Sequence, residues 1–249
     1  MTIEEYFGDW CKVIDLQEAD RILKKLSQSR QIICPQIKNI FRAFHLCPLS
    51  NLKVIILGQD PYSTLSSPIA PIGNISTIGT ITTTNPTNPL PTATGISFAN
   101  SSDTPLNSYS PSLAVLRDSV IDFTLQHRNP TFDPTLEKWE EQGVLMLNSA
   151  LSCEAGKIGS HTLLWRPFMK SLLTNLSNYT SGIIYVLMGN SAQTLEPYIS
   201  SKSNYIIKTK HPSWYARSQA RMPSDIWRQI NTILKGLYGA GVKWYEEQE

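Results

Sequence analysis

Three polar side chains with catalytic potential follow short apolar segments of the sequence: Asp60, Asn148 and His211. A carboxylate can act as a base or stabilise a cation, and an imidazole can donate a hydrogen bond to a developing anion. A carboxamide can donate and accept hydrogen bonds at once. Each residue also has an ordinary explanation, as a turn acid, a strand-end cap or a surface imidazole. Because all three follow segments of the same kind, we interpret them as parts of one site.

The apolar segments have the length and the β-branched content of buried parallel strands, at 54–57, 144–147, 183–187 and 205–207. Apolar residues at three- and four-residue spacing predict helices at 112–123, 165–176, 192–198 and 225–237. This alternation predicts an α/β fold: a three-layer single domain with a central, mostly parallel four-stranded sheet flanked by helices. In open sheets of this kind, functional residues gather beyond the carboxyl ends of the strands.

No change in composition marks a domain boundary, so we expect residues 1–249 to form a single domain. One segment, at about 63–94, departs from the pattern: it has no charged residue, five prolines and repeated Thr, Ser and Asn. Such a composition cannot bury enough apolar surface to fold alone. We therefore expect it to be a low-complexity inserted loop.

The overall composition, with 41% hydrophobic and 17% charged residues, is that of a globular protein. No apolar stretch approaches the roughly 20 residues needed to span a bilayer, and the acidic N-terminus does not resemble a secretory signal. The four cysteines contain no C-x-x-C pair, which predicts free thiols in a reducing compartment and no zinc site. We expect a protein that is not secreted and binds no membrane. Its location would be the cytoplasm of a bacterium, or a nuclear or host-cell compartment of a eukaryote or virus.

Positive charge is concentrated near the C-terminal end of the sequence. Residues 202–228 contain six basic residues against Asp225 alone, although the net charge of the whole chain is only +2. A basic segment of this kind suits a polyanion, although on charge alone an ordinary solvated face is the slightly better explanation.

At the strand ends and the loops around them, the chain resembles the family 1 uracil-DNA glycosylases. The resemblance runs from about Tyr6 to the C-terminal helix, interrupted only by the insertion. Its motifs are, in order, Gly58-Gln-Asp-Pro-Tyr62, Gly95-Ile-Ser-Phe98, Pro111-Ser112, Leu147-Asn148 with Ala155-Gly156 and Ser160-His161, and His211-Pro-Ser213. The resemblance implies an enzyme that flips uracil out of DNA and hydrolyses the N-glycosidic bond, leaving an abasic site. It implies no metal, no cofactor and no lyase step.

The resemblance also implies a role for each matching residue. Asp60 would orient or deprotonate the attacking water and stabilise the cationic sugar, and His211 would donate a hydrogen bond to uracil O2. Asn148 would read the base edge. Phe98 would stack on the base, and Tyr62 would fill the space beside C5, where thymine carries a methyl group. Gln59 would contribute through its main chain.

Further matching residues would contact the DNA backbone, through hydroxyls and main-chain N–H groups. These are Pro111, Ser112, Gly189, Asn190 and Ser213. The chain departs from the family at three places. Asn190 takes a place often held by Ser. Ser63 stands where the family usually has His, and Trp214-Tyr215 stand where it has Pro-Leu. Either aromatic ring could fill the gap that the flipped base leaves, and a stacking residue would favour single-stranded DNA.

Three other functions are compatible with parts of the sequence. A glycosylase with wider base choice would have to accommodate a methyl group beside Tyr62. A DNA-binding replication accessory protein could retain the fold with weak or no activity, but would have no reason to keep all three polar residues. The third is an unrelated nucleotide-binding α/β protein. Against it, no G-x-G-x-x-G or P-loop motif follows any of the predicted strands. The expected partners are single- or double-stranded DNA and a protein inhibitor or replication protein, with the chain acting as a monomer.

Overall fold

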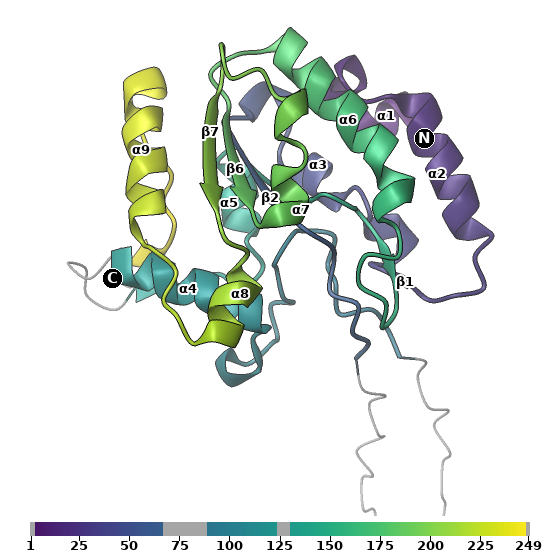
Figure 1. Ribbon diagram of the computed structural model, residues 1–249, viewed down its shortest axis with the longest axis horizontal. Coiled ribbons are helices and arrows are strands. Elements are labelled where there is room, and N and C mark those ends of the chain that lie inside the picture. The colour runs from purple at the N-terminus through teal and green to yellow at the C-terminus, as the bar shows by residue number, and fades with distance from the viewer. Residues whose placement is uncertain (1–2, 67–88, 124–129, 248–249) are drawn as a thin grey trace, which may run out of the picture.

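The computed structural model describes residues 3–66, 89–123 and 130–247. Its centre is a four-stranded parallel sheet with the strand order β4-β2-β6-β7 (Figure 1). These strands span Val54–Gly58 (β2), Val144–Asn148 (β4), Ile184–Met188 (β6) and Tyr205–Thr209 (β7). The predicted sheet is therefore confirmed, with each strand close to its expected bounds.

The register brings the carboxyl ends of the strands to one edge of the sheet. Gly58 at the end of β2 pairs with Asn148 at the end of β4, and Met188 pairs with Thr209 at the ends of β6 and β7. One expectation was wrong: β7 is not fully buried. It is an edge strand whose outward side chains reach solvent, and Tyr205 is 41% exposed.

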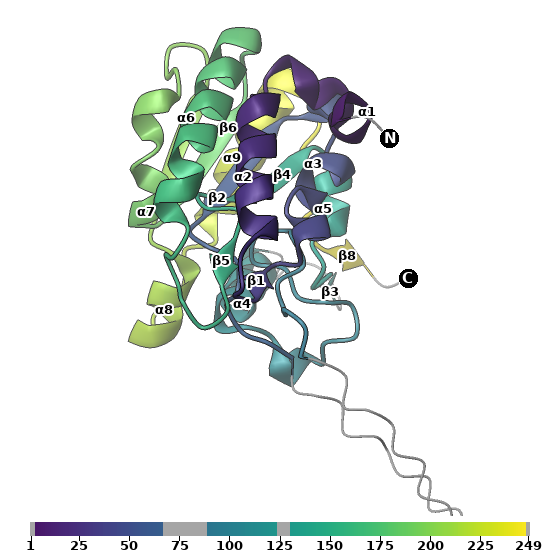
Figure 2. The same ribbon diagram turned by 90° about the vertical axis from the view of Figure 1, so that its right-hand side faces the viewer.

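Helices cover both faces of the sheet, as the predicted three-layer arrangement requires (Figures 1 and 2). One core contains Ile55 and Leu57 of β2, and the other contains Val54 and Ile56, because successive side chains of a strand point to opposite faces. The first core is covered by α2 (Leu16–Ser27) and α6 (Thr162–Tyr179). The second is covered by α4 (Pro111–Phe123) and α9 (Asp225–Tyr238).

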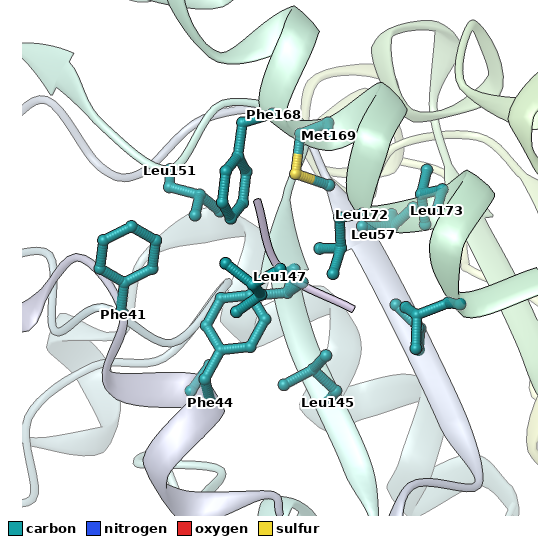
Figure 3. Close-up of a cluster of buried hydrophobic side chains, with 14 of the residues drawn as sticks. Phe41, Phe44, Leu57, Leu145, Leu147, Leu151, Phe168, Met169, Leu172 and Leu173 are labelled. Carbon is teal, nitrogen blue, oxygen red and sulfur yellow. The ribbon is translucent and has the colours of Figure 1, made fainter. Parts of the chain in front are cut away.

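Figure 3 shows how the strands pack in the first core: Leu57, Leu145 and Leu147 lie among the rings and side chains of α3 and α6, including Phe44 and Phe168. The remaining helices and strands are short. They are α1 (Ile3–Phe7), α3 (Arg42–Leu46), α5 (Glu137–Glu141), α7 (Asn190–Gln193), α8 (Pro212–Ser218), β1 (Ile33–Cys34), β3 (Pro130–Thr131), β5 (Cys153–Glu154) and β8 (Glu246–Glu247). Within the described residues, no helix has the length and apolarity needed to cross a bilayer.

The helix predicted at 192–198 is interrupted. The chain forms the four-residue α7 and then a separate 3-10 turn over Glu196–Tyr198. Pro197, at the second position of that turn, has no N–H to continue α-helical hydrogen bonding. Helix α2 was not predicted from the sequence. Its N-cap Asp15 accepts a hydrogen bond from the main-chain N–H of Glu18.

Only the ends of the predicted insertion lie within the described residues. They run antiparallel to one another, with Leu65 opposite Pro91 and the main-chain N–H of Ser66 donating to the Leu90 carbonyl oxygen at 2.7 Å. Residues 67–88 lie outside the described part of the chain. The prediction of an inserted loop therefore extends beyond what the structure describes.

A buried acid supports the outer edge of β4. Glu140 is fully buried, and its Oε1 accepts a hydrogen bond from the main-chain N–H of Met146 at 2.9 Å. The Met146 carbonyl oxygen accepts in turn from the N–H of Ser97 at 3.1 Å. Burial raises the pKa of Glu140 well above its usual range, although the hydrogen bond from Met146 opposes the shift. Glu140 thus binds a proton more readily in the folded chain than in the unfolded chain.

We expect Glu140→Gln to remove part of the pH dependence of stability. Because the folded-state pKa is raised, the contribution of Glu140 is full below its unfolded pKa, about 4.3, and declines as pH rises through the folded value. Glutamine keeps the acceptor oxygen and cannot ionise. Thermal unfolding should give similar Tm values at pH 5 and a higher Tm for the variant at pH 8. Glu141→Gln, at an exposed position of α5, is the control. An identical pH dependence in wild type and Glu140→Gln would contradict this account.

Candidate active site

The structure brings Asp60, Asn148 and His211 together at one enclosed pocket beyond the carboxyl ends of the strands. Asn148 ends β4, Asp60 follows β2 by two residues, and His211 follows β7 by two residues. The aligned strand ends therefore position all three side chains. The full lining is Ile40, Asp60, Pro61, Tyr62, Ala93, Gly95, Ile96, Phe98, Ser112, Leu147, Asn148, Leu151 and His211.

Gly58 allows the walls of this pocket to approach one another closely. A Cβ atom at Gly58 would lie 2.6 Å from Asn148 Oδ1, 2.7 Å from Ser97 Oγ and 2.8 Å from the ring of Phe98. These distances are too short for any side chain. The close approach of three side chains therefore requires glycine at this position.

The carboxylate of Asp60 is held on one side and free on the other. Its Oδ2 accepts hydrogen bonds from the Gly159 N–H at 2.9 Å and from Gln59 Nε2 at 3.1 Å. Its Oδ1 is buried and has no hydrogen-bond partner within the described residues. Burial raises the pKa of Asp60, and the two hydrogen bonds oppose that shift. One oxygen is thus fixed in place while the other can accept a hydrogen bond from a bound molecule.

Gln59 makes defined contacts through both its side chain and its main chain. Its side chain supports Asp60, while its carbonyl oxygen accepts hydrogen bonds from Ser149 Oγ at 2.8 Å and from the Ala150 N–H at 3.1 Å. Gln59 does not line the enclosed pocket. Its expected main-chain contribution to uracil binding stays a prediction. Gly159, which the sequence analysis missed, makes the other contact to Asp60.

His211 is fixed in one tautomer by the start of α8, for which it is the N-cap. Its Nδ1 accepts a hydrogen bond from the Ser213 N–H at 3.1 Å and lies 2.8 Å from Ser213 Oγ. Since Nδ1 is an acceptor, the proton of the neutral ring is on Nε2. Burial, and then the charge of Arg217, lowers the pKa of His211 to about 4. The ring is therefore a neutral Nε2–H donor near pH 7.

Gly189 makes room for His211. It has φ +86, in the region that favours glycine, and a Cβ there would lie 2.7 Å from the Cβ of His211. Gly189 also precedes α7, so the turn after β6 and the residue after β7 pack directly against one another.

The Asn148 carboxamide is buried and has one defined partner. Its Oδ1 accepts a hydrogen bond from Ser97 Oγ at 2.8 Å, and only 7% of the residue is exposed. Sequence reasoning missed Ser97, although it lies inside the Gly95–Phe98 motif. A hydroxyl in this position holds the carboxamide plane while leaving the second lone pair of Oδ1 available.

Phe98 and Tyr62 form a connected wall of the pocket. Phe98 has φ +66, unusual for a residue with a side chain, and its ring centroid lies 5.5 Å from that of His211. The Tyr62 hydroxyl donates to the Phe98 carbonyl oxygen at 2.7 Å and accepts from the Ser110 hydroxyl. The Ser110 N–H donates to Asn100 Oδ1 at 3.1 Å. Tyr62 therefore supports the backbone of Phe98 as well as occupying space.

An open groove adjoins the enclosed pocket. The two share Asp60, Pro61, Tyr62, Ser112 and His211. Nearly all the residues expected to contact DNA line this groove. The full lining is Gln59, Asp60, Pro61, Tyr62, Ser63, Thr64, Pro111, Ser112, Ile158, Met188, Gly189, Asn190, Ser191, Lys210, His211, Ser213, Trp214 and Arg217.

Tyr215 is the exception among the residues expected to contact DNA, because its ring does not line the groove. Only 8% of Tyr215 is exposed, its ring packs in the second core, and its hydroxyl lies 3.2 Å from Thr209 Oγ1. The segment is the helix α8, in which successive side chains point in different directions. Trp214 therefore faces outward, 38% exposed, with Lys210 Nζ 3.4 Å from its ring centroid.

The fold and the site define an α/β protein with a small pocket, lined by a carboxylate, a carboxamide and an imidazole, that adjoins a partly basic groove. Comparison with known proteins agrees with this class. The model of the uracil DNA glycosylase superfamily matches residues 44–235. A uracil-DNA glycosylase of Campylobacter jejuni is 34% identical over 215 residues, covering 86% of this chain and 79% of the relative. Uracil-DNA glycosylase 1 of Listeria monocytogenes is 30% identical over 248 residues, covering 98% and 96%.

Solved structures share the fold. Mimivirus uracil-DNA glycosylase superposes with a TM-score of 0.69 at 24% identity, covering 98% of this chain and 93% of that one. The Y322F variant of the mimivirus enzyme, in complex with UGI, gives a TM-score of 0.73 at 24% identity, covering 97% and 87%. The chain belongs to the uracil DNA glycosylase superfamily. The predicted activity, that of a monofunctional uracil-DNA glycosylase, is confirmed.

Proposed function

We propose that the enclosed pocket binds a uracil flipped out of DNA and that Asp60 and His211 promote cleavage of its bond to the sugar. The observation that carries this assignment is the convergence of three groups on one pocket: a free carboxylate oxygen, an imidazole N–H and a carboxamide. Flipping costs a few kcal/mol of lost stacking and pairing, which contacts in the pocket and the groove must offset.

Cleavage places negative charge on the base and positive charge on the sugar. The Nε2–H of His211 donates to uracil O2, where the negative charge develops, and its neutral state means that no proton must be transferred. Asp60 supplies a negative charge near the sugar. Its Oδ1, which has no partner among the described residues, accepts a hydrogen bond from the attacking water and directs it to C1′.

Asn148 distinguishes uracil from cytosine by hydrogen-bond polarity. Its Oδ1 accepts from N3–H while its Nδ2 donates to O4, and the hydroxyl of Ser97 holds the carboxamide for both contacts. Cytosine presents an acceptor at N3 and a donor at C4, so both contacts become unfavourable. Leaving buried polar groups unpaired costs about 1–3 kcal/mol each, which is sufficient for strong discrimination.

Tyr62 has two separable roles, which two substitutions distinguish. Tyr62→Phe keeps the ring that excludes a C5 methyl group but loses the hydrogen bond to the Phe98 carbonyl oxygen. We expect kcat/KM on uracil DNA to fall about tenfold, with no gain of activity on thymine. Tyr62→Ala removes the ring as well and should permit slow release of thymine. Release of thymine by Tyr62→Phe, or none by Tyr62→Ala, would contradict the assignment of C5 exclusion to the ring.

The groove holds the DNA backbone on both sides of the flipped nucleotide. Ser112 lies in the first turn of α4, and Ser213 lies in the first turn of α8, so their hydroxyls and nearby main-chain N–H groups suit phosphate oxygens. The turn at Gly189-Asn190 provides a third contact. Lys210 and Arg217 add positive charge to the same groove, which makes binding dependent on salt concentration.

Trp214 is the exposed ring of the groove, and we assign it to stacking on an unpaired base. Base–aromatic stacking is worth about 1–3 kcal/mol, so Trp214→Ala should weaken binding of single-stranded DNA about tenfold and that of duplex DNA less. Fluorescence anisotropy with matched oligonucleotides measures both. Tyr179→Ala, at a 51% exposed ring outside the groove, is the control. An equal loss on both substrates would contradict a preference for single strands.

The substrate assignment has a direct test. The protein is incubated with single- and double-stranded oligonucleotides containing one uracil, or thymine or cytosine at the same position, followed by alkali treatment. We expect free uracil from the uracil substrates alone, and strand cleavage only after alkali. Cleavage without alkali would contradict a monofunctional reaction, and no release from either uracil substrate would overturn the proposal.

We further propose that the chain acts as a monomer, with residues 1–249 in one domain, and that it works in a reducing compartment. We also propose that a protein inhibitor or replication protein can bind it. The monomer is supported by the groove, which one chain forms by itself. A reducing compartment is supported by the free thiols of all four cysteines. An inhibitor is supported by the likeness to mimivirus UNG in complex with UGI. Gel filtration of the chain alone and with UGI tests the monomer and the inhibitor.

A further inference from the structure

Two cysteines lie directly opposite one another beneath the active-site loops. Cys34 of β1 pairs with Cys153 of β5 in an antiparallel register, and both residues are fully buried. Directly opposite residues of such a pair have Cα atoms about 4.5–5.5 Å apart and point their side chains to the same face. A disulfide needs Cα atoms about 4.4–6.8 Å apart, so the backbone already has the spacing of a bonded pair.

The surroundings of the pair make the two sulfurs chemically different. Contact with Cys153 lowers the pKa of Cys34, although burial opposes this effect. The same contact, together with burial, raises the pKa of Cys153. The Cys153 thiol donates a hydrogen bond to the carbonyl oxygen of Pro61 at 3.5 Å. This contact holds the thiol proton on Cys153, so we assign the first attack to Cys34.

The other two cysteines lack this arrangement. Cys47 is buried in the first core, where burial raises its pKa, and its N–H continues the hydrogen bonding of α3. The Cys11 thiol donates to the Glu4 carbonyl oxygen at 3.5 Å, near the N-terminus. Both are free thiols, as are Cys34 and Cys153, and they provide matched controls within the same chain.

We propose that Cys34 and Cys153 form a reversible intramolecular disulfide when the protein meets a peroxide. The Cys34 thiolate attacks one peroxide oxygen, the O–O bond breaks, and Cys34 becomes a sulfenic acid while the other oxygen leaves as water after protonation. The Cys153 sulfur then displaces the sulfenic oxygen, which leaves as water with the thiol proton. In total, two thiols and one hydrogen peroxide give one disulfide and two waters, and a thiol reductant reverses the reaction.

The position of this bond links two segments that support the site. After β5, the Gly156 N–H donates to the Ser63 carbonyl oxygen at 2.8 Å and the Gly159 N–H donates to Asp60 Oδ2 at 2.9 Å. Before β1, the Ile32 carbonyl oxygen accepts from the Ala155 N–H at 2.9 Å. The disulfide closes a loop of about 120 residues, which strongly restricts the unfolded chain. Oxidation should therefore raise Tm, by roughly 5–15 °C.

The experiment uses the full chain, reduced and then treated with hydrogen peroxide. Free thiols are blocked under denaturing conditions, and peptides are mapped by mass spectrometry without reduction. We expect a linked pair of peptides containing Cys34 and Cys153, lighter by two hydrogen atoms than the sum of the two. Addition of a thiol reductant should separate the peptides, and thermal unfolding should show the higher Tm only for the oxidised protein.

Variants assign the bond to this pair. Cys34→Ser and Cys153→Ser should each abolish the linked peptide and the rise in Tm, whereas Cys11→Ser and Cys47→Ser should retain both. If a serine variant does not fold, the wild-type peptide map still shows whether Cys34 and Cys153 are linked. The proposal is overturned if wild-type Cys34 and Cys153 remain blocked as free thiols, proceed to sulfinic acid without linking, or link to Cys11 or Cys47.

Discussion

Asp60→Asn is expected to lower the single-turnover rate of uracil release about 1000-fold, while affinity for uracil-containing DNA changes no more than a few-fold. Asparagine has nearly the same shape and can still accept from the Gly159 N–H, which binds Oδ2 at 2.9 Å. It has no negative charge to stabilise the sugar cation and is a poor base for water. The loss therefore falls on the chemical step rather than on binding.

The pH dependence of the wild-type rate of uracil release should report the ionisation of Asp60. Burial raises the pKa of Asp60, so the active, ionised form is lost as pH falls through a value above that of a free aspartic acid. We expect this acidic limb in the wild-type rate and its absence from the residual activity of Asp60→Asn.

The thermal stability of Asp60→Asn distinguishes the loss of a catalytic group from unfolding of the variant. Because the folded-state pKa of Asp60 is raised, the charged form destabilises the folded chain at neutral pH, and Asp60→Asn should have a Tm at or above that of wild type. Asp103→Asn, the same chemical change at an exposed position, is the control. Turnover by Asp60→Asn within tenfold of wild type would remove Asp60 from its assigned role.

His211→Leu is expected to reduce uracil release about 100- to 1000-fold, the effect of removing one preorganised donor to a developing anion. Leucine fills similar space but cannot donate to uracil O2. Binding of DNA should be largely retained, because the groove contacts of Ser112 and the turn at Gly189 do not involve the imidazole.

The tautomer gives His211 a second, independent test. The neutral ring with its proton on Nε2 should persist across pH 5–8, since its pKa is lowered to about 4. Nitrogen NMR of the His211 ring measures this directly, with exposed His45 as an internal comparison. A protonated His211 at pH 6, or near-normal turnover by His211→Leu, would contradict donation from a neutral imidazole.

The sequence was sufficient to locate the sheet and the three central side chains. Buried parallel strands give dense apolar segments, and the register of Gly58 with Asn148 follows from aligning them. The resemblance to a family then supplied roles that spacing alone could not. Trp214 and Tyr215 show the limit, because only the helical geometry of α8 determines which ring is buried.

Other features could not be read from the sequence because they depend on contacts between distant segments. Ser97 reaches Asn148 and Gly159 reaches Asp60 only after the chain has folded. The same holds for Cys34 and Cys153, whose separation in sequence concealed that they lie directly opposite. Short helices were not predicted for another reason. Helix α8, with seven residues, is too short for a helical spacing of apolar residues to be recognised.

The buried ring of Tyr215 anchors α8 to the second core. The side chain of His211 caps the start of this helix, and Trp214 projects from its outer side. The base stacking proposed for Trp214 would therefore place nucleic acid against the same helix whose start is capped by His211. Any displacement of α8 on DNA binding would move the Trp214 and His211 side chains together.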